Sequence, residues 1–86
     1  MQALRQRFIG EAEGEAAALE AQAAAQAWIE VRDLSHRVAG RAGMFGFPDL
    51  TDLARELEEA VDAGVPGPDL QRLASGLAFC LRALET

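Results

Sequence analysis

One histidine and two glycines stand at spacings that suit chemistry on a helix surface. His36 is the only histidine of the chain, and Gly40 and Gly43 follow it. In an α-helix, residues three to four positions apart lie on the same face, one turn above the other. An exposed imidazole there is a usable nucleophile. The pattern therefore predicts a reactive ring on a surface cleared of side chains.

The glycines indicate a docking surface rather than plain solvent. Each interior glycine destabilises a helix by roughly 1 kcal/mol relative to alanine, and solvated surface has no need of it. Ile29, an apolar residue two turns before His36, falls on the same face. We therefore expect another protein to approach His36. An incidental histidine on a structural scaffold is the alternative interpretation.

The helix that carries His36 is expected from about residue 26 to residue 45. Apolar residues recur there at three- and four-residue intervals, as in an amphipathic helix: Val31, Leu34, Val38, Ala42 and Phe45. The centre of this stripe lies roughly 160° from His36 around the helix axis, so the ring should point away from the core. On the helical wheel, its neighbours are Ile29, Arg32, Asp33, Ala39, Gly40 and Gly43.

Three further amphipathic helices are expected. The first covers about residues 1–22 and carries Leu4, Phe8, Ala12, Ala16 and Leu19. The third begins at Pro48, ends at Gly64 and carries Leu50, Leu53, Leu57 and Val61. The fourth begins at Pro68 and Asp69 and carries Leu70, Leu73, Leu77, Leu81 and Leu84. Proline suits a first helical turn, and glycine, as at Gly46 and Gly64, suits a helix end. The Ala-rich stretch 21–27 has no strong stop signal, so a tight turn and a continuous bend are both open there.

Each apolar stripe needs a partner, so four such helices predict one fold. It is an all-α, antiparallel up-down four-helix bundle in a single domain, residues 1–86, with His36 exposed on the second helix. The aromatic residues are interpreted as packing residues: Phe8, Trp28, Phe45, Phe47 and Phe79. Cys80 lies in the apolar part of the last helix and is expected in the core.

Composition excludes several classes of function. The net charge of −6 argues against nucleic-acid binding, which requires a basic patch. No apolar run approaches the roughly 20 residues that span a bilayer, and the N-terminus has no signal-peptide core, so a cytoplasmic protein is expected. One histidine and one cysteine offer too few ligands for a metal site. The acidic runs Glu11–Glu20 and Glu56–Glu59 are interpreted as solvated helix faces.

The segment Leu34–Leu57 resembles the histidine-containing phosphotransfer (HPt) domain. The signature of that family is a histidine, an apolar residue two positions later, often lysine at three, glycine at four, and small residues at seven and ten. Here those positions hold His36, Val38, Ala39, Gly40, Gly43 and Gly46. Phe47-Pro48 and the leucine pattern from Leu50 to Glu58 also resemble the next helix of the family.

The resemblance implies a phosphoryl carrier that is not itself an enzyme. His36 would be the phospho-acceptor, receiving phosphate from a receiver-domain aspartate and passing it to another receiver. Gly40 would leave room for the phosphoryl group, and Gly43 would be the second small position. The partners implied are response-regulator receiver domains and a hybrid histidine kinase. Mg²⁺ is expected on the receiver, with no cofactor on this chain, which is expected to be a monomer.

The departure from the family is Ala39, where many members have lysine. Arg32 and Arg37 are candidates to replace that cation, because guanidinium pairs well with phosphate oxygens. Arg41 should project closer to the flank of the core and fall short of the phosphate.

A second alternative is the dimerisation and phosphoacceptor helix pair of a sensor histidine kinase. In that family's histidine box an acidic residue usually follows the histidine directly, and proline stands five positions after it. Here these positions are Arg37 and Arg41. The chain also has no Gly-rich nucleotide-binding segment, so autophosphorylation from ATP is not expected.

Overall fold

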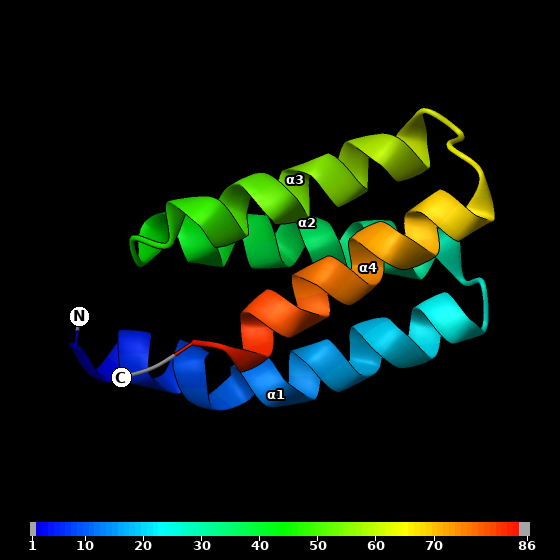
Figure 1. Cartoon of the computed structure of the whole chain (residues 1–86). Coiled ribbons are helices and arrows are strands. Elements are labelled where there is room, and N and C mark those ends of the chain that lie inside the picture. Colours follow the sequence, from blue (N-terminus) through cyan, green and yellow to red (C-terminus); the bar gives the residue numbers. More distant parts are fainter. Residues whose placement is uncertain (1, 85–86) are drawn as a thin grey trace.

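The computed structural model describes residues 2–84, which form four helices. They are α1 (Gln2–Ala24), α2 (Trp28–Met44), α3 (Pro48–Asp62) and α4 (Gly67–Arg82). Short turns join them, and successive helices run in opposite directions (Figure 1). The closest neighbours are α2 with α3 and α1 with α4. The predicted all-α four-helix bundle is confirmed.

Three turns end the first three helices in the same way. In each, a residue with positive φ follows the helix: Gln26 (57°), Gly46 (82°) and Gly64 (73°). The next amide then donates a hydrogen bond back into the last turn, as from Ala27 to the Gln22 carbonyl at 2.9 Å. This hydrogen bond satisfies a carbonyl that has no partner within the helix. Glycine adopts the required positive φ without strain. The open boundary at residues 21–27 is therefore a tight turn, formed without the glycine that would have announced it.

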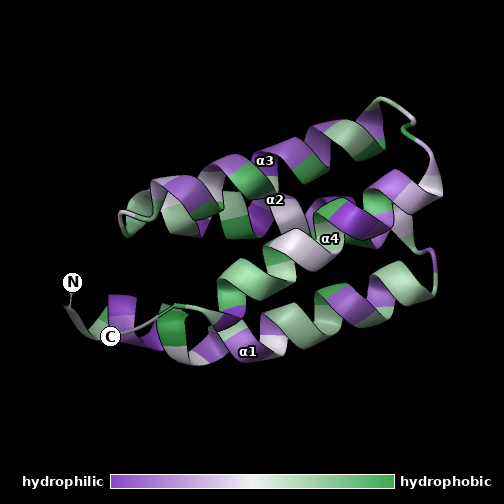
Figure 2. Ribbon diagram, viewed as in Figure 1, coloured by the Kyte–Doolittle hydropathy of each residue, from purple (hydrophilic) through white to green (hydrophobic). Residues whose placement is uncertain are grey.

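The core runs along the axis of the bundle. Its largest fully buried apolar side chains come from all four helices: Phe8, Leu19, Leu57, Leu77, Leu81, Val31 and Val38. Phe8 closes one end, with its ring centroid 5.7 Å from that of Phe45 and 5.8 Å from that of Phe47. In Figure 2, hydrophilic and hydrophobic segments alternate along α3, as expected for a helix with one buried face. The predicted packing roles of Phe8, Phe45 and Phe47 are confirmed.

Two predicted packing residues are exposed instead. Phe79 is 74% exposed. It lies two positions after the buried Leu77, and two positions turn an α-helix by about 200°, toward the opposite face. Leu4 is half exposed because the start of α1, the longest helix, projects beyond the end of α4 (Figure 1). Cys80 is only partly buried, at the edge of the core.

Among the helices over residues 2–84, none is long and apolar enough to cross a membrane.

Candidate functional site

The middle of α2 holds His36 on a rigid support. Val31, Leu34 and Val38 on the same helix are buried in the core. Ser35, also buried, donates its hydroxyl hydrogen to the Val31 carbonyl at 2.8 Å, so this polar side chain is satisfied within the helix. The His36 side chain is 74% exposed. The predicted orientation of the ring, away from the core, is confirmed.

Among residues 2–84 the ring has one hydrogen-bond partner, and it lies on α3. Nδ1 of His36 is 2.9 Å from Oε2 of Glu58, whose side chain is 25% exposed. A carboxylate only accepts hydrogen bonds, so Nδ1 carries the hydrogen in this contact. In the neutral ring, the lone pair is then on Nε2. The contact therefore selects Nε2 as the nucleophilic atom and holds the plane of the ring.

Open space lies beside the ring at Gly40. A Cβ at this position would meet no atom within 4 Å, so packing inside the bundle does not require glycine there. At Gly43 a Cβ would meet only Thr51 Oγ1, at an ordinary contact distance of 3.7 Å. Ile29, two turns before His36, is exposed, as predicted. Gly40 thus leaves the surface beside the ring open, whereas Gly43 faces Thr51 of α3.

Ala39 is buried, with 5% of its surface exposed, which contradicts its predicted place on the outer face. The apolar stripe of α2, from which the buried face was predicted, marks only part of the surface that this helix buries. In the bundle α2 packs against both α1 and α3, so its buried arc is wider than the stripe. Ala39 falls in the part of this arc that faces α3, because it lines a pocket together with Arg55 and Glu58 of that helix.

Arg32, a predicted phosphate partner, is held by two carboxylates. Its guanidinium lies 3.1 Å from Asp33 Oδ1 and 3.4 Å from Asp62 Oδ1. The hydrogen bonds to Asp33 and then to Asp62 raise the pKa of Arg32 above its ordinary value. These exposed contacts draw the guanidinium toward Asp33 and Asp62, in a hollow that His36 also lines.

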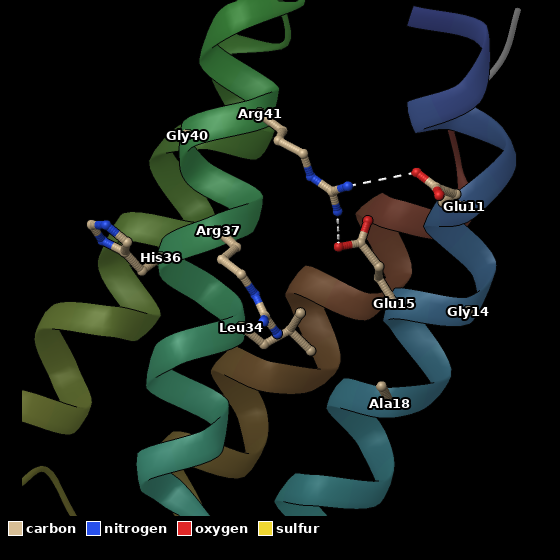
Figure 3. Close-up of a pocket in the computed structure, with 9 residues that line it drawn as sticks. All are labelled: Glu11, Gly14, Glu15, Ala18, Leu34, His36, Arg37, Gly40 and Arg41. Atoms are coloured by element: carbon tan, nitrogen blue, oxygen red, sulfur yellow. Dashed lines mark hydrogen bonds and ion pairs between the residues drawn. The ribbon is translucent and has the colours of Figure 1, made fainter. Parts of the chain in front are cut away.

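On its other side, α2 borders a groove along α1 (Figure 3). Arg37, the second predicted phosphate partner, lies along this groove beside Leu34, and His36 borders the groove while its ring turns away from α1. Arg41 forms ion pairs with Glu11 and Glu15 of α1, so its predicted position near the core flank is confirmed.

Glu15 corrects the interpretation of residues Glu11–Glu20 as a solvated face. Its side chain is only 14% exposed. Burial raises the pKa of Glu15, and the nearby Arg41 lowers it by less. One carboxylate oxygen of Glu15 and Nε of Arg41 are buried and find no hydrogen-bond partner in the part of the chain that the structure describes.

Glu58 is the residue that sequence reasoning missed, because it was assigned to the solvated run Glu56–Glu59. A signal existed: His36 and Glu58 lie eleven residues to either side of Phe47, in the turn between α2 and α3. In an antiparallel helix hairpin, residues equidistant from the turn lie at the same level.

Across residues 2–84, no group of three or more histidine, cysteine, aspartate or glutamate side chains is arranged to hold a metal ion.

Comparison with known families agrees with this geometry. The model of the Hpt domain family matches residues 3–86. This chain belongs to the Hpt domain family. Such a domain is a phosphotransfer module of two-component signalling, which acts with receiver domains and kinases and is a carrier rather than an enzyme of the usual kind. No curated protein and no solved structure matches the chain in the same comparisons.

Proposed function

We propose that this Hpt domain carries a phosphoryl group on Nε2 of His36, between the aspartates of two receiver domains. The observation that carries the proposal is the contact of Nδ1 with Glu58 on an otherwise exposed ring, which leaves Nε2 toward solvent. The partners would be the receiver of a hybrid histidine kinase and that of a response regulator. The Hpt match over residues 3–86 favours this function over the helix pair of a sensor kinase or a plain scaffold.

The transfer step balances with the residues of this site. The Nε2 lone pair attacks the phosphorus of the phospho-aspartate, and the P–O bond to the aspartate breaks. The bonding electrons leave with the aspartate carboxylate. The ring then bears phosphorus on Nε2 and hydrogen on Nδ1 and is positively charged. Glu58 faces that hydrogen, so its carboxylate stabilises the charge formed during the step. The reverse step passes the group to a second receiver.

The partner supplies the rest of the chemistry in this proposal. Phosphoryl transfer depends on in-line positioning and on neutralising the charge of the moving group. A Mg²⁺ ion held by the receiver would do most of this. The space over Gly40 would admit the phosphoryl group and the receiver surface that presents it.

The test is phosphoryl transfer from a phosphorylated receiver to the wild type and to His36→Gln. We expect the wild type to gain one phosphate, seen by intact mass in mild base, and the variant to gain none. Circular dichroism should show equal helicity, because His36 is exposed and its contact with Glu58 contributes little to stability. Phosphate on the variant, or none on the wild type from any of a panel of receivers, would overturn the proposal.

A further inference from the structure

A phosphoryl group on His36 would enter an acidic environment. A pocket of about 430 Å³ beside the ring is lined by Glu58, Glu59 and Asp62 of α3, and Asp33 borders the ring on α2. A phosphoryl group adds a charge of about −1.5 to −2 at neutral pH. At such distances like charges repel, so a cation within the domain would be needed to hold the phosphorylated state.

The arginines named from the sequence border a hollow that His36 also lines, but both are drawn toward other carboxylates. Arg32 is held by Asp33 and Asp62. The Arg37 side chain leaves α2 toward the groove along α1 (Figure 3), where its charge acts on Glu15, although it also borders a hollow that His36 lines. The family position for lysine is Ala39, which is buried and uncharged.

Arg55 of α3 stands where a cation is needed. It lines the same pocket as His36, Ala39 and Gly40. It precedes Glu58 by three residues, and residues three apart on a helix are neighbours on one face. Because α2 and α3 are antiparallel, one turn back along α3 from Glu58 is one turn forward along α2 from His36, at the level of Ala39 and Gly40.

The Arg55 guanidinium is also available. It is exposed, and within residues 2–84 no ion pair engages it. Glu59, one turn further along α3, lines the same pocket without pairing with it. Arg32, Arg41 and Arg82, in contrast, each contact two carboxylates.

We propose that Arg55 binds the phosphoryl group on His36, and so supplies from α3 the cation that Ala39 cannot supply from α2. The proposal rests on the proposed function, since it requires His36 to be phosphorylated. The open space over Gly40 is where the phosphoryl oxygens and the guanidinium would meet. Arginine suits this role, because its planar fork donates two parallel hydrogen bonds to phosphate oxygens.

The experiment phosphorylates the whole domain with phosphoramidate, a small donor that requires no receiver. ³¹P NMR then follows the phosphoryl resonance of the wild type, Arg55→Gln and Arg55→Lys as the pH is changed. A nearby cation favours the dianion, so we expect Arg55→Gln to take up the phosphoryl proton at a higher pH than the wild type. Arg55→Lys, which keeps the charge, should restore much of the difference. A purely structural role would not move this titration.

A receiver supplies the second readout. At equilibrium with a phosphorylated receiver, Arg55→Gln should hold about fivefold less phosphate than the wild type, the scale of one charge-assisted contact that is partly screened by solvent. Arg7→Gln is the matched control, because Arg7 is an exposed arginine of α1 that lines none of the pockets shared with His36.

The possible failures are distinguishable. A wild type that takes phosphate from neither donor would overturn the proposed function together with this inference. A wild type that is phosphorylated on His36, with Arg55→Gln unchanged in both readouts, would overturn the role of Arg55 alone. Arg37→Gln is the third variant. If it lowered the amount of phosphate held and raised the pH of phosphoryl protonation while Arg55→Gln did neither, the phosphoryl-binding cation would be Arg37.

Discussion

Two charged contacts leave α2 in opposite directions, and they differ in burial. His36 meets Glu58 on α3, with side chains 74% and 25% exposed. Arg41, little more than one turn later, meets Glu15 on α1, with side chains 37% and 14% exposed. The first contact joins a titratable ring to a carboxylate in water. The second joins a guanidinium to a carboxylate in a half-buried groove.

The difference shows how one helix separates chemistry from support. An exposed ion pair contributes little to folding, so the ring of His36 is available to a partner protein without loss of the fold. A buried pair stabilises little as a whole, but removing one partner leaves an uncompensated charge and costs far more. Mutations of the contact toward α1 should therefore lower the stability of the fold. Mutations of the contact toward α3 should instead impair function.

The largest expected effect is on stability, from Arg41→Ala. Glu15 would then lack its counter-charge while it remains buried, and we expect the free energy of unfolding to fall by about 2 kcal/mol. Urea unfolding followed by circular dichroism measures this change. Adding Glu15→Gln to Arg41→Ala should recover part of the loss, because the uncompensated charge is then gone. An Arg41→Ala variant as stable as the wild type would show that the groove is solvated and would remove the contrast.

The next effect is on transfer, from Glu58→Ala. Without the carboxylate, Nδ1 no longer holds its hydrogen toward α3 and the ring loses its orientation. We expect transfer to slow about tenfold, the scale of one hydrogen bond to a charged group. Stability should change little, because the contact is exposed. Glu58→Gln, whose amide oxygen can accept the same hydrogen, should lie between.

Imidazole ¹⁵N shifts distinguish positioning from a structural effect of Glu58. The wild type and Glu58→Gln should show hydrogen mainly on Nδ1, and Glu58→Ala a mixture of tautomers. Identical ¹⁵N shifts in all three proteins would contradict the role given to Glu58.

The smallest effect is a pH dependence that arises from Glu15. Burial raises the pKa of Glu15 in the folded state above its ordinary value of 4.5. A group with a raised folded pKa stabilises the fold fully below its unfolded pKa, and this contribution is lost as the pH rises through the folded pKa. The wild type should therefore be more stable relative to Glu15→Gln near pH 4 than near pH 7. Urea unfolding of both proteins at the two pH values tests this, and the opposite trend would mean that Arg41 outweighs burial.

The sequence was informative where a residue acts through its own helix. The stripe from Val31 to Ala42 indicated which side of α2 is buried, and this placed His36 outside. Gly46 and Gly64 marked helix ends, because positive φ favours glycine strongly. The end of α1 could not be predicted in the same way, because Gln26 adopts the positive φ there in place of a glycine. Phe79 was misassigned because its apolar character suggested burial, while its position on the helix predicts exposure.

The sequence by itself determined the all-helical bundle, the exposed histidine and the cleared surface at Gly40, because these depend on spacing along one helix. Only the tertiary structure decided the neighbours of the ring. Glu58 contacts His36 from α3, Arg55 of α3 lines a pocket beside the ring, Ala39 is buried, and Arg41 pairs with Glu15 on α1. These contacts depend on the level at which antiparallel helices pack against each other. That level is set jointly by the turns and the core, so it is not a property of any one segment.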